Sequence, residues 1–300
     1  MPAPRTERMA IAAELVAVLV AVTDAEPRVL TIRDTSNLPS GPLSAGHSSL
    51  QSGLRAWVEQ QTHHPLGYVE QLYTFADRDR SADSSLHAIS ISYLGLTREA
   101  DPTGETVRGW QNWYEFFPWE DHRSGVPALL IQAILPRLAG WAAADGARRQ
   151  RVAVTFSPES WNEELVLQRY ELLFEAGLIP ESPLAAADCL TGRTMMFDHR
   201  RILATGIARL RAKIKYRPVV FELMPPTFTL LQLQRCVEAV AGRMLHKQNF
   251  RRLIEQQSLV EETGESTQNT AGRPAKFFRF RRDVLAERAV SGTKLPLARS

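Results

Sequence analysis

The stretch Gly41–Thr62, GPLSAGHSSLQSGLRAWVEQQT, predicts a loop that leads into an amphipathic helix. Ser48 is a suitable N-cap, because its hydroxyl can accept a hydrogen bond from an unpaired N–H of the first helical turn. Arg55 and Glu59 lie four residues apart on the polar face, so an ion pair between them is expected. The apolar residues recur at helical spacing and predict one buried face, formed by Leu50, Leu54, Trp57 and Val58.

The segments around this helix have the patterns of strands. Arg28–Arg33, Tyr68–Phe75 and His87–Leu94 each alternate between apolar and polar residues. The apolar run Met9–Val22 fits either a strand or a buried helix, and we favour a hairpin with Arg28–Arg33 because a turn separates the two. The run is too short to cross a bilayer. This order of elements predicts an α+β sandwich built around the central helix.

The middle of the chain is aromatic and helical. Trp110–Arg123 would form either a ligand or dimer contact or a plug in the core, and we favour the core because aromatic side chains dominate burial. Helices are predicted over Pro127–Ala144 and Trp161–Ala176, with a short strand at Arg151–Phe156 between them. Prolines and small residues then mark Ile179–Thr191 as a boundary or linker.

Charge is distributed unevenly along the chain. The net charge is only +3, but from residue 199 onward 20 lysines and arginines stand against 8 acidic residues. Residues 1–198 carry 16 basic and 25 acidic residues. The excess of basic residues in the C-terminal third favours a polyanionic binding partner for this part of the chain. The alternative interpretation is a basic, solvent-exposed surface that binds no partner.

Three helices and two strands follow in the order of a winged helix-turn-helix. Asp198 and Thr229 are candidate N-caps of the first two helices, and Gly242 ends the second. Val219–Leu223, between these two helices, is predicted to be a short extended piece. The order of the elements, together with the charge, favours double-stranded DNA as the partner.

The third predicted helix, His246–Gln257, is the candidate recognition helix, and Phe250, Leu253 and Ile254 would anchor it to the core. Its other side chains suit a major groove, because Arg reads guanine, Gln or Asn reads adenine, and Lys neutralises phosphate. Strands at Leu259–Glu262 and Lys276–Arg281 would form the wing. The candidate DNA-binding residues are Lys247, Gln248, Asn249, Arg251 and Arg252 of the helix and Arg273 and Lys276 of the wing, with Arg279 and Arg281 as further wing cations.

The opening stretch resembles a degenerate Nudix box. Four residues fall in register with that motif, namely Gly41, Arg55, Trp57 and Glu59. Three positions at which the Nudix family has glutamate hold other residues, namely His47, Ala56 and Gln60. Nudix hydrolysis needs several carboxylates to hold Mg²⁺, so we expect no metal site and weak or no hydrolysis.

Other segments extend the resemblance to the Nudix-related transcriptional regulators of NAD metabolism. They are QLYTFADRDR (Gln71–Arg80), KQNFRR (Lys247–Arg252) and GRPAKFFRF (Gly272–Phe280). FFPWEDHR (Phe116–Arg123) and RYELLFEAGL (Arg169–Leu178) are similar to the alphaproteobacterial NAD regulator branch. The resemblance implies a Nudix-like α/β/α sandwich followed by a winged helix-turn-helix domain. It also implies a homodimer that binds operator DNA, represses NAD biosynthesis or salvage genes and senses an NAD-related nucleotide.

These considerations define the expected organisation. A Nudix-like ligand-sensing domain would span residues 9–190, with a helical insert at about 110–176, and a winged helix DNA-binding domain would span 195–285. The effector would be NAD, ADP-ribose or ATP, with no cofactor required. The candidate ligand-binding residues are Arg55, Glu59, Gln60, Arg78 and Arg80.

Two cysteines far apart in the sequence, Cys189 and Cys236, argue against disulfides and fit a reducing cytoplasm. Trp119–Arg123 contains Glu, Asp and His, but no second His motif completes a metal-ligand set. Two alternatives to a repressor stay open. One is a Nudix hydrolase of a nucleoside diphosphate derivative such as ADP-ribose, with a basic accessory domain. The other is a nucleotide-binding module whose basic domain grips RNA.

Overall fold

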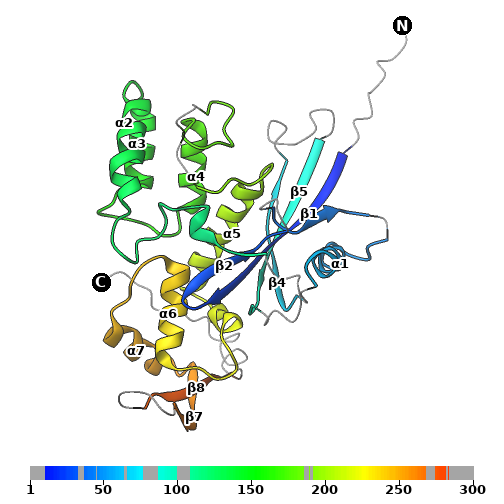
Figure 1. Cartoon of the computed structure of the whole chain (residues 1–300), viewed down its shortest axis with the longest axis vertical. Coiled ribbons are helices and arrows are strands. Elements are labelled where there is room, and N and C mark those ends of the chain that lie inside the picture. The colour runs from blue at the N-terminus through cyan, green and yellow to red at the C-terminus, as the bar shows by residue number, and fades with distance from the viewer. Residues whose placement is uncertain are drawn as a thin grey trace.

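The computed structural model describes residues 11–32, 37–44, 46–63, 66–76, 87–99, 109–185, 189, 192–267, 274–281 and 283. A mixed sheet lies between helices on its two faces (Figure 1). Its main path has the order β4-β5-β1-β2-β6, and β3 pairs with β1 beside this path. The strands are β1 (Ile11–Thr23), β2 (Glu26–Leu30), β3 (Ser40–Pro42), β4 (Tyr68–Phe75), β5 (His87–Leu96) and β6 (Trp110–Asn112).

β1 is the central strand of the sheet. It pairs in parallel with β5 from Ile11 to Val20 and antiparallel with β2. Asp24 and Ala25, between β1 and β2, have φ values of 54° and 60°, and two successive positive φ angles are the geometry of a type I′ hairpin turn. The predicted hairpin and the strands at residues 68–75 and 87–94 are therefore confirmed.

Side chains of β1 alternate between two buried faces. Leu15 and Leu19 pack with Leu54 and Val58 of α1 (Leu50–Thr62), which covers one face of the sheet. Val16, Val18 and Val20 belong to the core on the other face. There α5 (His199–Lys213) crosses so closely that a Cβ added at Gly206 would lie 2.9 Å from Val18 Cγ1. The sheet is thus the middle layer of an α/β/α sandwich.

The aromatic segment after β6 is a core plug, as predicted. Trp113, Phe116, Phe117 and Trp119 are fully buried. The helices that follow are η3 (Leu130–Ile134), α2 (Leu135–Ala142), α3 (Gly146–Thr155) and α4 (Val166–Glu175), after a short turn η2 (Trp113–Glu115).

The strand predicted at Arg151–Phe156 is wrong, because this segment is the end of α3. Asp145 caps α3 by accepting hydrogen bonds from the backbone N–H groups of Ala147 and Arg148. The cap and the packing against α2 and α4 override the β-branched alternation of residues 152–155. The helix predicted over Trp161–Ala176 exists, but it begins at Val166.

The C-terminal part contains η4 (Val219–Leu223), α6 (Leu230–Ala241), α7 (Lys247–Gln256) and the hairpin β7 (Val260–Ser266) and β8 (Lys276–Phe280). The predicted Thr229 cap and the left-handed Gly242 terminus of α6 are confirmed. Asp198 occupies the N-cap position of α5 without a capping hydrogen bond, since its carboxylate pairs with Arg201.

The extended piece predicted at Val219–Leu223 is wrong, because the segment forms a single 3₁₀ turn. It begins after Pro218, whose fixed φ suits the start of a helix. The turn buries Val219, Val220 and Leu223 against the core. Burial of three apolar side chains within five residues therefore decides the local structure.

Both cysteines are free, as predicted. Cys236 lies in α6, and burial raises the pKa of its thiol to about 12. Among the helices that the structure describes, none is long and apolar enough to cross a membrane.

Candidate nucleic-acid interface and Nudix-like helix

α7 is amphipathic, with an apolar face towards the core and a polar face towards solvent. Phe250 and Ile254 are buried, and Leu253 is half-buried, as predicted for the anchoring face. Among the described residues, none forms a hydrogen bond or ion pair with the side chains on the exposed face. The exposed residues of α7 are Lys247, Gln248, Asn249, Arg251 and Arg252, all five of the predicted helix positions, together with Glu255 and Gln256.

The turn before α7 is held by buried polar groups of α6. The Glu238 carboxylate accepts hydrogen bonds from the Leu245 backbone N–H at 2.8 Å and from Gln234 Nε2 at 2.9 Å. Gln234 Nε2 also donates to the Leu245 carbonyl oxygen at 3.1 Å. Both polar groups of Leu245 are therefore fixed, so the direction in which α7 leaves α6 is fixed as well.

The wing is attached to the rest of the domain by aromatic packing. The Phe280 ring stacks on Phe221 of η4, with ring centroids 4.2 Å apart. Phe228 and Phe278 exchange two backbone hydrogen bonds of 2.9 and 2.8 Å. These contacts join β8 to η4 and to the segment that precedes α6.

Two of the described wing cations, Lys276 and Arg279, are exposed and paired with carboxylates of β7, whereas Arg281 Nη1 donates to the Ser258 carbonyl oxygen at 3.2 Å. Lys276 Nζ lies 2.8 Å from the Glu262 carboxylate, and Arg279 Nε lies 2.6 Å from that of Glu261. Exposed pairs of this kind contribute little stability, so a phosphate could replace the carboxylate. The wing thus differs from α7, where the cations have no such partners. Arg273 lies outside the described residues.

α1 differs from the predicted Nudix-like helix in its cap and in the partner of Arg55. Ser49, not Ser48, is the N-cap, and it forms a reciprocal capping box with Ser52. The expected ion pair between Arg55 and Glu59 is absent between these two described residues. Arg55 instead donates to the backbone carbonyls of Leu66 and Gly67, the latter at 3.1 Å. Competition from fixed carbonyls thus outweighs a weak surface ion pair.

The remaining residues of the box lie in two different settings. Glu59 and Gln60 are exposed on α1, while Gly41 lies under the Trp57 indole. A Cβ added at Gly41 would be 2.3 Å from Trp57 Cδ2, and the indole Nε1 donates to the Pro42 carbonyl at 3.0 Å. Gly41 and Trp57 are therefore packing residues.

Two predicted ligand residues, Arg78 and Arg80, lie outside the described residues. Within the described part of the chain, no three His, Cys, Asp or Glu side chains are grouped to hold a metal ion. α1 carries a single carboxylate, Glu59, whereas a hard dication prefers several oxygen ligands. The residues of α1 do not fit a magnesium site.

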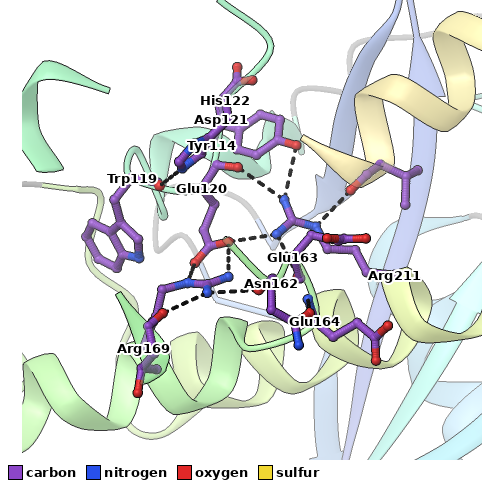
Figure 2. A network of polar contacts seen from close by, with 12 residues as sticks. Tyr114, Trp119, Glu120, Asp121, His122, Asn162, Glu163, Glu164, Arg169 and Arg211 are labelled. Carbon is purple, nitrogen blue, oxygen red and sulfur yellow. Dashed lines mark hydrogen bonds and ion pairs between the residues drawn. The ribbon is translucent and has the colours of Figure 1, made fainter. Parts of the chain in front are cut away.

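A buried ion network lies between the sheet and the C-terminal helices (Figure 2). The Glu120 carboxylate accepts hydrogen bonds from Arg169 Nε at 2.5 Å and from Arg211 Nη1 at 2.7 Å. Burial alone would raise the pKa of Glu120, but the two guanidinium groups hold this pKa below its usual range. Glu120 therefore stays ionised inside the protein.

The same network reaches the end of α6. Tyr114 Oη donates to the Ala239 carbonyl oxygen at 2.7 Å, and Arg211 Nε donates to the Val240 carbonyl oxygen at 2.9 Å. Arg211 Nη2 also donates to Tyr114 Oη at 3.3 Å. Residues from the aromatic segment and from α5 thus bind the C-terminal carbonyls of α6.

Sequence reasoning missed this network. The sequence predicts Trp110–Arg123 as a core plug and Trp119–Arg123 as an incomplete metal-ligand set, and neither interpretation includes an ion network. A signal was present: Arg211 lies one residue after the buried Leu210 and four after the buried Ile207, on the apolar face of α5. A charged residue at such a position needs a buried partner. The sequence alone does not identify Glu120 as that partner.

Comparisons with known proteins agree with this arrangement. Residues 220–280 match the family described as the NrtR DNA-binding winged helix domain. The ADPR responsive transcriptional repressor NtrR of Acinetobacter baylyi is 42% identical to this chain over 87 residues. That alignment covers 29% of this chain and 34% of the repressor, so the chain matches about a third of this curated relative.

Solved structures match over most of the chain. NrtR of Shewanella oneidensis in complex with a 27mer DNA has a TM-score of 0.58 at 18% identity, covering 91% of this chain and 95% of NrtR. A MutT/nudix family protein of Enterococcus faecalis has a TM-score of 0.54 at 17% identity, covering 94% and 90% of the two chains. Likenesses at these identities establish the fold.

The protein therefore combines a Nudix-like α/β/α sandwich with a C-terminal winged helix domain, as predicted. Residues 220–280 form a winged helix of the NrtR DNA-binding family, and the predicted resemblance to the Nudix-related regulators is confirmed. The assignment to the alphaproteobacterial branch stays a prediction, as do the domain boundaries. α5 packs against both the sheet and α6, although the sequence places it with the C-terminal domain.

Proposed function

We propose that the protein is a transcriptional repressor that binds operator DNA through α7 and the wing. One observation carries this proposal. α7 presents exposed basic and amide side chains that have no hydrogen-bond or ion-pair partner among the described residues, on a winged helix of the NrtR type. Such side chains suit base edges and phosphates in a major groove. The family match favours DNA over the RNA alternative.

The proposal gives the individual residues distinct roles. Arg251 and Arg252 would read guanine, Gln248 and Asn249 would read adenine, and Lys247 would neutralise phosphate. Lys276 and Arg273 of the wing would contact phosphate or the minor groove. We assign residues 195–285 to the DNA-binding unit and residues 9–190, with the insert at 110–176, to the sensor.

The protein would bind as a homodimer. A two-fold symmetric protein recognises a palindromic site, with half-sites separated by about one or two turns of DNA. The regulated genes would be those of NAD biosynthesis or salvage. This part of the proposal follows the resemblance to the regulators of NAD metabolism.

The Nudix-like unit would sense an NAD-related nucleotide, with NAD, ADP-ribose and ATP as candidates. The name of the Acinetobacter relative, which is ADPR responsive, makes ADP-ribose the first to test. Glu59 and Gln60 are exposed on α1 and available to a ligand. Arg55 would support the pocket through its bonds to the loop at Leu66 and Gly67. Arg78 and Arg80 are the remaining candidates.

We infer that the sensor does not hydrolyse its ligand. Glu59 is the single acidic residue of α1, and Gln60 and Ala56 are neutral. Hydrolysis at this site would need further carboxylates around a divalent cation. The hydrolase alternative makes an opposite prediction: Mg²⁺-dependent cleavage of ADP-ribose that is lost in Glu59→Gln.

The test of the proposed function is a gel-shift titration of the full chain on DNA from its own promoter region. Low salt maximises the phosphate contribution, so a specific complex should form there and survive competition by unrelated DNA. NAD, ADP-ribose and ATP are added separately, and one of them should shift the DNA-binding curve. Failure to retard the fragment at low salt would refute the proposal.

A further inference from the structure

The C-terminal end of α6 is capped by groups from α5 and from the aromatic segment that follows β6. The last carbonyls of a helix have no partner within that helix. Here Tyr114 Oη binds the Ala239 carbonyl and Arg211 Nε binds the Val240 carbonyl. The backbone N–H of His122 donates to the Gly242 carbonyl at 2.7 Å. Three separate donors thus hold consecutive parts of one helix end.

The contact is tight as well as polar. Gly242 has a φ of +71°, and a Cβ at this position would lie 2.5 Å from the Glu120 carbonyl oxygen and 2.8 Å from Tyr114 Oη. It would also lie 2.7 Å from Arg211 Nη2. Only glycine satisfies both the left-handed backbone and this approach. The C-terminal end of α6 therefore packs directly against the residues of the Glu120 network.

The segment that carries Tyr114 and Glu120 is also bound to the sheet. Arg123 Nη1 donates to the Ala25 carbonyl at 2.7 Å, and Nη2 lies 2.9 Å from the Glu26 carboxylate. Both partners belong to the tight β1–β2 hairpin. Asn112 Nδ2 donates to the same Glu26 carboxylate at 2.8 Å. The segment from Asn112 to Arg123 is thus anchored to the hairpin at both of its ends.

The fixed end of α6 leads directly into α7. Gly242 and Lys247 are separated by a turn in which both polar backbone groups of Leu245 are held by Gln234 and Glu238. Arg243, in the same turn, approaches the Glu163 carboxylate at 3.7 Å. No flexible joint therefore separates the network from the exposed face of α7.

We propose that Tyr114, Glu120 and Arg211 are positioning residues that set the orientation of α7 relative to the Nudix-like sheet. This inference rests on the proposed function, in which α7 contacts DNA. The three residues do not touch DNA themselves. Tyr114 and Arg211 hold the Ala239 and Val240 carbonyls, and Glu120 holds Arg211 in place. A change in the network therefore moves α7 against its target.

The test uses Tyr114→Phe in the full chain, because this change removes one hydroxyl and preserves the packed ring. Tyr68→Phe is the matched control. Tyr68 lies on β4, and its hydroxyl accepts a hydrogen bond from Lys213 Nζ of α5 at 2.6 Å. Amide hydrogen exchange of the free protein is measured first. In Tyr114→Phe, the amides from Gly242 to Phe250 should exchange faster, while Tyr68→Phe leaves them unchanged.

DNA titrations at several salt concentrations form the second measurement. Loss of a buried hydrogen bond should weaken binding of Tyr114→Phe to promoter DNA by about tenfold. Misplacement of α7 also removes phosphate contacts, so the slope of log K against log salt should become shallower. Partial unfolding alone would lower the active fraction and leave the slope unchanged. That result would overturn the proposal, as would unchanged exchange and unchanged affinity.

A second variant, Glu120→Gln, should show the same pattern more strongly wherever it still folds. If the wild-type chain itself fails to bind promoter DNA, the proposed function is refuted. Hydrogen exchange of Tyr114→Phe then decides separately whether the network holds α7.

Discussion

Glu120 and Arg211 form an ion pair of 2.7 Å, and their side chains are 1% and 0% exposed. Burial of either charge without a partner would destabilise the fold, because a lone buried ion is far less stable than a hydrated one. Arg169 supplies a second cation, also fully buried, so one carboxylate lies between two guanidinium groups. The backbone carbonyls of Asn162 and Glu163 accept further hydrogen bonds from Arg169 and Arg211, at 2.9 and 3.0 Å.

This geometry predicts a large loss of stability in Glu120→Gln. The substitution leaves two buried arginines without a carboxylate, and breaking a buried pair costs about 3–5 kcal/mol. Urea unfolding monitored by tryptophan fluorescence would measure the change in the free energy of unfolding. The control is Glu175→Gln, which breaks the exposed pair with Arg151 and should cost less than about 1 kcal/mol. Equal losses in both variants would contradict the prediction.

His199 should make stability depend on pH between about 4 and 6.5. It is buried, its Nδ1 accepts a hydrogen bond from the Leu38 N–H at 3.0 Å, and burial lowers its pKa to about 4. The unfolded chain therefore binds a proton in this range that the folded protein rejects. The stabilising contribution is complete above pH 6.5 and is lost as the pH falls towards 4.

The variant His199→Asn retains an acceptor for the Leu38 N–H but cannot titrate. From pH 6.5 to 5.0 the wild type should lose about 2 kcal/mol that the variant does not lose. Urea unfolding at a series of pH values gives both curves. If the two curves stay parallel through this range, His199 is not the source of the pH dependence.

Gly41 and Gly46 provide a test of the packing under the Nudix-like helix. A Cβ at Gly41 would overlap the Trp57 indole, whereas nothing lies within 4 Å of a Cβ at Gly46. Gly41→Ala should therefore cost about 1–3 kcal/mol through overpacking, and Gly46→Ala should be nearly neutral. Denaturant midpoints of the two variants check this, and a neutral Gly41→Ala would show that the indole moves freely.

Much of the sandwich was predictable from local patterns. Alternating apolar residues predict the strands β4 and β5, and a turn between two apolar segments predicts the hairpin of β1 and β2. In the C-terminal domain, Gly242 likewise predicts the end of α6. The two segments whose secondary structure was predicted wrongly, Arg151–Phe156 and Val219–Leu223, are short and apolar and contain β-branched residues. For segments of this length, the period does not separate strand from helix, and tertiary packing decides.

The exposed DNA-binding candidates were predictable because α7 is strongly amphipathic. Once Phe250 and Ile254 are assigned to the core, the positions of Arg251 and Arg252 on the outer face follow. The Glu120 network was not predictable in the same way. Its members are distant in sequence, and a buried arginine such as Arg211 shows that a partner exists without showing which carboxylate it is.

Replacement of Arg252 tests the recognition helix directly. Arg252 is exposed on α7 and has no ion-pair partner among the described residues. Arg252→Ala should lower specific DNA affinity by about 1–3 kcal/mol if the side chain reads a base, while nucleotide binding stays unchanged. Arg148→Ala, on exposed α3, is the control and should bind DNA as the wild type does. Equal affinity of both variants would remove Arg252 from the interface.

Glu262→Gln should strengthen DNA binding, an unusual direction for a substitution at an interface. Lys276 is 61% exposed and pairs with Glu262, so the carboxylate competes with any phosphate for the ammonium group. Its removal frees one cation for a phosphate contact. The slope of log K against log salt should then steepen by up to about 0.9, while stability changes by less than about 1 kcal/mol.

Glu175→Gln, which frees Arg151 of α3, serves as the control and should leave the slope unchanged. Anisotropy titrations at several salt concentrations measure both variants. An unchanged slope in Glu262→Gln would show that Lys276 does not contact the phosphates.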